Sequence, residues 1–142
     1  YISVKSMYMG RSGNGSISKL VNNIIVAINI AAISVGYAFA KKAGINPNDL
    51  FEIIKDGFAG SKVMDSKIPK ILDRDFSPSA RMKIHQKDLL NAIEYGDFLN
   101  IKLPLTEIVL DFMNKAETLG FINEDHCAII KIYEDNMDVI VD

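Results

Sequence analysis

The chain has 142 residues, of which 49% are hydrophobic and 24% are charged, and its formal net charge at pH 7 is −2. That length supports one globular domain with a sizeable core, and the balanced charge excludes the basic surface that nucleic acids require. The single cysteine, Cys127, excludes an internal disulfide, and two histidines give little support to a zinc site. A reducing, cytoplasmic setting is therefore expected.

The opening segment, residues 2–9, alternates loosely between apolar and polar positions and is expected to form a short strand. The glycine-rich residues 10–15 then break regular structure. From residue 16 to residue 43 only Gly36 interrupts a helical pattern, and Gly44 follows where a C-terminal cap glycine is common. The sequence therefore predicts one helix that is long for a globular domain.

The middle of this helix, residues 24–40, is almost wholly apolar. At ~1.5 Å per residue it falls just short of a ~30 Å hydrocarbon core, and it also contains Asn29, Ser34 and Gly36. We therefore expect no membrane span, but a helix that is buried on all sides inside a bundle.

Shorter helices are predicted after the long one. Asn46 followed by Pro47 is typical of a helix start, and this helix is expected to end near residue 56. Ser61 should cap the next helix, and further helices are expected over residues 81–100, over residues 104–120 and up to residue 136, the last one capped by Asn123 or Asp125. The fold class is therefore all-α, a helical bundle built around one long buried helix.

The start of the long helix holds the candidate chemistry. Lys19 and Asn23 are four residues apart and share one helix face. No acidic residue occurs from residue 16 to residue 48, so Lys19 is predicted to be an unpaired cation, and desolvation there would make it a usable proton donor. The residues alone also allow a solvated lysine near a helix start, with Asn23 as a polar residue at a helix contact.

Two phosphate-binding motifs are excluded at the same place. Gly10 and Gly15 have the spacing of a P-loop, but Ser16 stands where its lysine should be. Gly13-x-Gly15-x-x-Ser18 is similar to a dinucleotide fingerprint, but that motif needs an acid about twenty residues later and a second strand, and neither follows.

The pattern Gly-x-Gly-x-x-x-Lys-x-x-x-Asn at the head of a long helix resembles the catalytic motif of the β-hydroxyacid dehydrogenases. Five further segments resemble the same family in order: residues 57–61, 73–78, 85–89, 103–106 and 125–126. The resemblance implies a bundle like the C-terminal domain of 6-phosphogluconate dehydrogenase. It makes residues 1–14 a strand and glycine turn that join a Rossmann domain, and residues 15–142 a helical substrate and dimerisation domain.

The resemblance also implies a role for each motif residue. Lys19 would be the general acid that protonates the substrate carbonyl, and Asn23 would bind the substrate and hold Lys19 in place. Gly13 and Gly15 would let the backbone approach the substrate, because neither has a Cβ. A second set, Lys87 and Asp88, would lie at the edge of the nicotinamide and substrate pocket, unless the two form only a surface pair.

The implied cofactor is NAD or NADP, bound mainly by the Rossmann domain. The implied substrate is a small carboxylated aldehyde or hydroxy acid, with tartronate semialdehyde reduced to glycerate as the first expectation. Ala80 stands where the family usually has an aromatic residue, which weakens that choice. Another β-hydroxyacid such as 3-hydroxyisobutyrate, and a non-catalytic helical dimerisation module, are the alternatives. A homodimer or homotetramer is expected, and the chain alone is expected to be inactive.

Three residues outside the motif are predicted to be structural. His85 is expected on a helix surface or in a contact between domains, and His126 at a helix start. Cys127 is expected to be a small buried residue.

Overall fold

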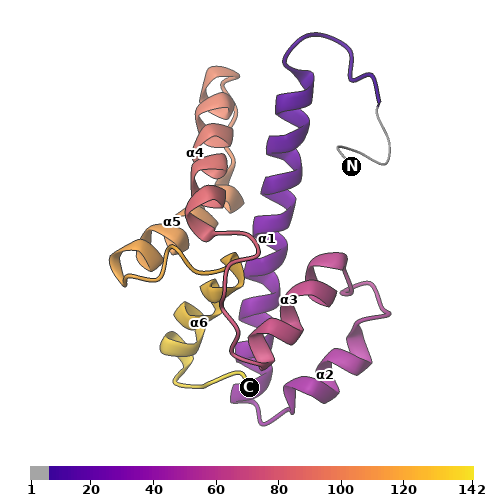
Figure 1. The fold of residues 1–142 in the computed structure, drawn as a ribbon, viewed down its shortest axis with the longest axis vertical. Helices are drawn as coiled ribbons and strands as arrows, with labels where there is room; N and C mark the ends of the chain where they lie inside the picture. The colour runs from indigo at the N-terminus through magenta and orange to yellow at the C-terminus, as the bar shows by residue number, and fades with distance from the viewer. Residues whose placement is uncertain (1–6) are drawn as a thin grey trace.

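The computed structural model describes residues 7–142, and these form a helical bundle without a sheet (Figure 1). The helices in chain order are α1 (Asn14–Lys42), α2 (Pro47–Ile54), α3 (Lys62–Leu72), α4 (Met82–Phe98), α5 (Pro104–Thr118), the 3-10 helix η1 (His126–Ile129) and α6 (Ile130–Met137). The all-α class is confirmed. Most of the expected N-terminal strand lies outside the described residues, and residues 7–9 form no regular structure.

Local signals place the ends of the helices. The Asn46 side chain accepts hydrogen bonds from the backbone N–H groups of Asn48 and Asp49, at 2.9 and 3.3 Å, and so starts α2. The Ser61 hydroxyl accepts a 3.0 Å hydrogen bond from the Met64 N–H and starts α3 in the same way. α1 begins two residues earlier than predicted, because Gly13 takes the N-cap position with φ +94°.

Gly60 shows why the chain turns so tightly before α3. A Cβ at this position would lie 1.8 Å from the Lys55 carbonyl oxygen, so only glycine fits there. The turn brings Ser61 against α1, where its hydroxyl donates a 3.0 Å hydrogen bond to Asn29 Oδ1. Asn29, a polar residue within the apolar run of α1, is therefore hydrogen-bonded to the N-cap residue of α3, the helix that packs on α1.

α1 is the axis of the bundle, and every other helix contacts it (Figure 1). Its first half packs in one core cluster with α4 and α5, in which Ala27 and Ile30 meet Leu89 and Met113. Its second half packs in another cluster with α3 and α6, which includes Tyr37 and Ile68. The two clusters divide the helix into a part beside α4 and a part beside α3.

The long helix is not buried on all sides within one chain, which corrects the expectation from its composition. Val21, Ile25 and Phe39 remain 49%, 60% and 67% exposed. α1 also has the length and composition of a membrane span, with 44% of its most apolar window buried in the fold. Its packing against the other helices is that of a core helix with one face left open.

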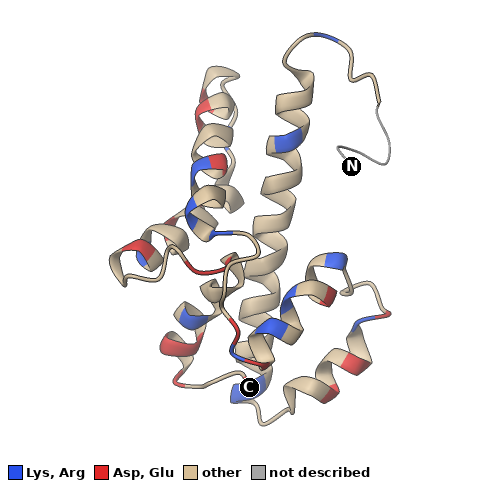
Figure 2. Ribbon diagram, in the orientation of Figure 1, with Lys and Arg blue, Asp and Glu red and all other residues tan. Residues whose placement is uncertain are grey.

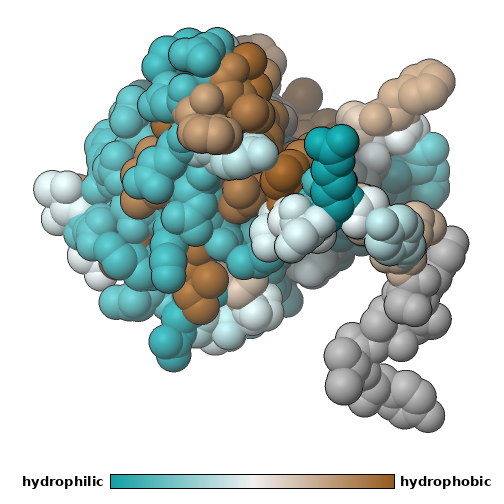
Figure 3. Space-filling view, turned by 90° about the horizontal axis from the view of Figure 1, so that it is seen from above, coloured by the Kyte–Doolittle hydropathy of each residue, from teal (hydrophilic) through white to brown (hydrophobic). Residues whose placement is uncertain are grey.

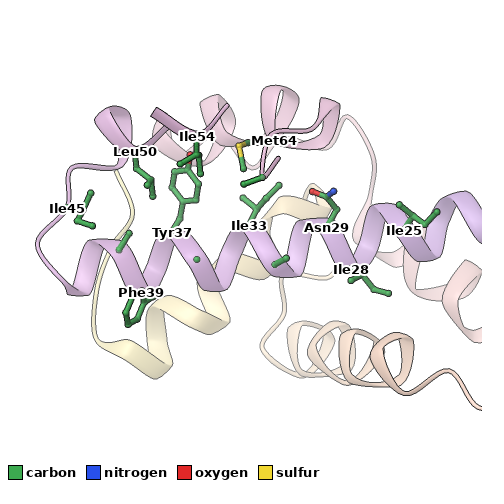
Figure 4. A pocket seen from close by; sticks show the side chains of 14 residues that line it. Ile25, Ile28, Asn29, Ile33, Tyr37, Phe39, Ile45, Leu50, Ile54 and Met64 are labelled. Atoms are coloured by element: carbon green, nitrogen blue, oxygen red, sulfur yellow. The ribbon is translucent and has the colours of Figure 1, made fainter. Parts of the chain in front are cut away.

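The open face includes an apolar groove of about 730 Å³ between α1, α2 and α3 (Figure 4). Ile33 and Tyr37 point from α1 toward Met64, Leu50 and Ile54 on the opposite wall. Burial raises the pKa of Tyr37 to about 12, so its hydroxyl is neutral at physiological pH. The groove therefore presents apolar side chains and no ionised group.

Candidate active site

The first turns of α1 and the middle of α4 bring three predicted residues together. Lys19 Nζ donates a 2.9 Å hydrogen bond to Asp88 Oδ1, and Asn23 Nδ2 donates a 2.6 Å hydrogen bond to Asp88 Oδ2. One carboxylate therefore holds both residues of the α1 motif. Lys19 is not the unpaired cation that its own helix suggested, because its partner comes from a segment 69 residues later in the chain.

Exposure separates the two members of this ion pair. The Lys19 side chain is 63% exposed, whereas that of Asp88 is only 12% exposed. The predicted desolvation of Lys19 is therefore absent in this chain, which is a second correction. An ammonium group has three N–H donors, and Asp88 uses one of them, so Lys19 retains donors that face solvent.

The remaining predicted site residues divide into near and distant ones. A Cβ added at Gly13 or Gly15 would meet no atom within 4 Å, so the backbone is open on that side just before Lys19. Lys87 is exposed and forms no ion pair with a described residue. Asp88, the next residue, belongs to the Lys19 cluster, and the place of both residues at the edge of a nicotinamide pocket stays a prediction. Figure 2 shows α1 almost without charge beside the charged α4.

A buried pair of histidines supports the site from behind. His85 Nε2 lies 2.8 Å from the Asn23 carbonyl oxygen, and His85 Nδ1 lies 3.0 Å from His126 Nδ1. A carbonyl only accepts, so the His85 proton is on Nε2 and His126 Nδ1 must donate to His85 Nδ1. His85 is 6% exposed, so the predicted position on a helix surface is wrong, while the alternative of a contact between domains stays a prediction. Burial lowers the pKa of both rings, that of His126 to about 4.

Asp125 fixes the loop beside these histidines. It is fully buried, and Lys67 Nζ donates to both of its oxygens at 3.0 and 3.1 Å. Its Oδ2 also accepts hydrogen bonds from the backbone N–H groups of Ser79 and Ala80, at 3.0 and 3.1 Å. Burial opposes ionisation, but the hydrogen bonds from Ser79, Cys127 and Lys67 outweigh it and hold the pKa of Asp125 well below its usual range.

A cavity of about 300 Å³ lies between the Lys19 cluster and this loop. Its lining includes Asn23 and Asp88 of the cluster together with Ala80, Arg81 and His126. Ala80 lines this cavity, and a larger side chain at this position would reduce the length of ligand that the cavity can hold. In residues 7–142 no group of three His, Cys, Asp or Glu side chains could hold a metal ion.

Exposed apolar side chains surround the same end of the molecule, where α1 begins and α4 ends. Seen from that end, hydrophobic residues form a patch in a mostly hydrophilic surface (Figure 3). Phe98 is 77% exposed, and Ile101 and Leu105 are 50% and 60% exposed. An apolar surface of this kind beside a polar cluster suits contact with another domain.

Two features of the site were missed from the sequence. The first is that Asp88 binds both Lys19 and Asn23. His85 and Asp88 share a helical face with Met82 and Ala92, and this spacing could have indicated that Asp88 is turned toward the core. The second is the Lys67–Asp125 pair, for which the sequence holds no local signal because its members lie 58 residues apart.

Comparison with known proteins identifies the family of the chain. Residues 13–133 match the family model described as NAD-binding of NADP-dependent 3-hydroxyisobutyrate dehydrogenase. The chain is 33% identical over 126 residues to 2-hydroxy-3-oxopropionate reductase of Escherichia coli K12, covering 89% of this chain and 43% of that protein. It is 31% identical over 135 residues to 2-(hydroxymethyl)glutarate dehydrogenase of Eubacterium barkeri, covering 94% and 45%.

A solved structure shows the same fold. Crystalline 3-hydroxyisobutyrate dehydrogenase from Salmonella typhimurium superposes with a TM-score of 0.81 at 28% identity, covering 84% of this chain and 42% of that one. The chain thus spans less than half the length of the relatives it matches. The resemblance seen in the motifs is confirmed, and the chain belongs to the 3-hydroxyisobutyrate dehydrogenase family of NAD(P)-dependent β-hydroxyacid dehydrogenases.

Proposed function

We propose that this chain is the substrate-side domain of a β-hydroxyacid dehydrogenase in which Lys19 is the general acid. The observation that carries the proposal is the cluster in which Asp88 holds Lys19 at 2.9 Å and Asn23 at 2.6 Å, while the Lys19 ammonium stays open to a ligand. A buried carboxylate that orients an exposed cation suits the delivery of a proton to a bound oxygen.

The chemistry is the reduction of an aldehyde that carries a carboxylate, or the reverse oxidation. A bound nicotinamide supplies the hydride to the carbonyl carbon. Lys19 stabilises the negative charge that develops on the carbonyl oxygen and donates the proton to it. Asp88 keeps the ammonium in place, and the second N–H of the Asn23 amide is available to the substrate.

The described residues suit the edge of a nicotinamide site better than the whole of it. Gly13 and Gly15 leave open backbone, and Lys19 and Lys87 add exposed cations at the same end of the molecule. The strand that a dinucleotide-binding turn requires does not occur in residues 7–142. We therefore assign the bulk of cofactor binding to a Rossmann domain that docks on the apolar patch of Figure 3, and we expect the chain alone to be inactive.

The substrate is proposed as a small carboxylated aldehyde or its hydroxy acid. The similarity to 2-hydroxy-3-oxopropionate reductase supports tartronate semialdehyde as the first compound to test. 3-Hydroxyisobutyrate is the second, because the matching family model and the superposed structure carry that name.

The test is a steady-state comparison of Lys19→Ala with the unchanged sequence in the complete enzyme. Loss of the general acid should lower kcat by roughly 10²–10⁴-fold, with a smaller change in KM, because the proton transfer stabilises only the transition state. Lys19→Arg should restore little, since a guanidinium does not give up its proton at neutral pH. Lys42→Ala, at the exposed far end of α1, is the matched control. Retention of more than about a tenth of kcat by Lys19→Ala would contradict the assignment.

We also propose that the chain self-associates through the open face of α1. The apolar groove of about 730 Å³ and the 67% exposed Phe39 support a second copy as the occupant, because the chain's own helices leave this apolar face of α1 uncovered. Light scattering should give more than one chain per particle, and Phe39→Asp should return the protein to a monomer. Ile53→Asp, at a 78% exposed position on α2 that does not line the groove, should have no effect. A monomer before any substitution would refute the proposal.

A further inference from the structure

The cavity beside the Lys19 cluster is larger than a three-carbon substrate needs. Asn23 and Asp88 belong to the cluster and also line the cavity of about 300 Å³, so the cavity adjoins the cluster. A ligand whose carbonyl oxygen lies at Lys19 therefore has room to extend past Ala80 toward Arg81. Tartronate semialdehyde would leave this space empty.

The charges that line the cavity favour an anion. Asp88 is compensated, because Lys19 Nζ lies 2.9 Å from its Oδ1 and Asn23 binds its Oδ2. Arg81 forms no ion pair with any carboxylate in residues 7–142. Arg81 is thus the charged residue of the lining that has no described ion-pair partner, and a guanidinium carries donors in a geometry that matches a carboxylate.

The backbone of Arg81 is held rigidly. It pairs with Asp125 in an antiparallel bridge, and the preceding Ala80 N–H donates a 3.1 Å hydrogen bond to Asp125 Oδ2. The Met82 and Lys83 N–H groups at the start of α4 already donate to the Glu124 and Ile122 carbonyls. An anion bound here would therefore be held by the Arg81 side chain and not by the start of the helix.

His126 offers an uncharged hydrogen-bond acceptor to a ligand in the cavity. It lines the cavity and is 6% exposed, and its Nε2 is buried without a hydrogen-bond partner among the described residues. The tautomer set by His85 leaves this nitrogen an acceptor, 3.9 Å from Asp125 Oδ1. A hydroxyl or a water suits this position, whereas a carboxylate belongs at Arg81.

We propose that the cavity is a subsite for a second carboxylate of the substrate, bound by Arg81 and admitted by the small side chain of Ala80. The proposal rests on the proposed function and extends its substrate class to dicarboxylic hydroxy acids and their aldehydes, which would fill a space that acids with one carboxylate leave empty. Ala80 and Arg81 are then the residues that determine specificity, while Lys19 serves the reaction common to all substrates.

The kinetic test uses the complete enzyme and two hydroxy acids, 2-(hydroxymethyl)glutarate with two carboxylates and 3-hydroxyisobutyrate with one. Arg81→Gln should lower kcat/KM for the first by roughly 10- to 100-fold, the usual range for a charge-assisted hydrogen bond, and leave the second nearly unchanged. Ala80→Phe should give the same split by filling the cavity. Lys83→Gln, which removes an exposed lysine of α4 that pairs with Glu117 of α5, is the control. Equal losses for both acids, or no loss for either, would overturn the subsite.

A binding measurement on the 142-residue chain separates this proposal from the catalytic one. Titration with glutarate should shift the NMR signals of the Arg81 side chain, in the unchanged chain and in Lys83→Gln alike. The remaining shifts around the cavity should vanish in Arg81→Gln, and their persistence there would overturn the subsite. If glutarate binds at Arg81 but the complete enzyme oxidises no hydroxy acid, the catalytic proposal fails while the anion subsite stands.

Discussion

Two lysine–aspartate pairs of almost equal length lie in opposite surroundings in this fold. Lys67 and Asp125 are separated by 3.0 Å, and their side chains are 8% and 0% exposed. Lys19 and Asp88 are separated by 2.9 Å, but the Lys19 side chain is 63% exposed. Distance alone therefore does not distinguish a structural pair from a candidate catalytic one, whereas the hydrogen-bonding capacity left unused does.

The buried pair is saturated with protein partners. Asp125 accepts from Lys67, from the Ser79 hydroxyl at 2.7 Å and from the backbone N–H groups of Ser79, Ala80 and Cys127. The Lys67 ammonium also donates to the Ser79 hydroxyl at 3.0 Å. Such a pair fixes the loop before α4 and leaves little capacity for a ligand. The Lys19 pair has free donors at the surface, which is the condition that a proton donor needs.

The largest expected effect breaks the buried pair. Asp125→Ala should lower the free energy of unfolding by about 3–5 kcal/mol, because it leaves the Lys67 ammonium buried without a counter-charge. Urea unfolding monitored by circular dichroism measures the loss. The matched variant Asp88→Ala should cost no more than about 1 kcal/mol, because Lys19 is solvated. Similar losses for the two variants would show that burial does not separate the pairs.

Acid should destabilise the fold through the histidines that lie between the two pairs. Burial lowers the pKa of His126 from 6.5 to about 4, so the unfolded chain binds the proton more tightly. The stabilisation is complete above about pH 6.5 and is lost as the pH falls toward 4, and His85 acts in the same direction. Between pH 7 and pH 5 the free energy of unfolding should fall by about 2 kcal/mol.

Urea unfolding at several pH values in this range measures that slope. His126→Gln removes one of the two titrating rings and should flatten the profile, whatever it does to stability at pH 7. Hydrogen bonds lower the pKa of carboxyl groups such as Asp75 and Glu117, so these groups titrate mainly below pH 5. The slope between pH 7 and pH 5 should therefore come mainly from the histidines. A profile that is flat from pH 7 to pH 5 in the unchanged chain would show that neither ring is held neutral by burial.

The sequence predicted those features whose cause is local. The caps at Asn46 and Ser61 and the glycine at the start of α1 were recognised because each acts on neighbouring backbone groups. Asp125 was one of two residues proposed as a cap, and its side chain does accept from the Cys127 N–H at 3.1 Å. The Lys67 contact was not foreseen, because it depends on how α3 packs against the loop before η1.

The state of Lys19 was predicted wrongly for a related reason. The long run without acids around it described its own helix, whereas its partner Asp88 lies on α4. The apolar length of α1 likewise indicated burial on every side, but composition does not tell whether the chain itself or a second copy covers a face. Val21, Ile25 and Phe39 show that this chain leaves one face open.

The smallest expected effect is the coupling free energy between the two side chains of each pair, which a double-mutant cycle measures. In a double-mutant cycle of Lys19→Ala and Asp88→Ala, the coupling free energy for folding should be about 0.2–1 kcal/mol, the usual range for exposed pairs. Raising the ionic strength to about 1 M should remove most of it, because the Debye length then falls to about 3 Å. The same cycle on Lys67 and Asp125 should give a larger coupling that salt leaves nearly unchanged, since water and ions do not reach Asp125. A salt-resistant coupling at Lys19 would mean that the pair is sealed from solvent and that its ammonium is closed to a substrate, and the catalytic proposal would then lose the observation on which it rests.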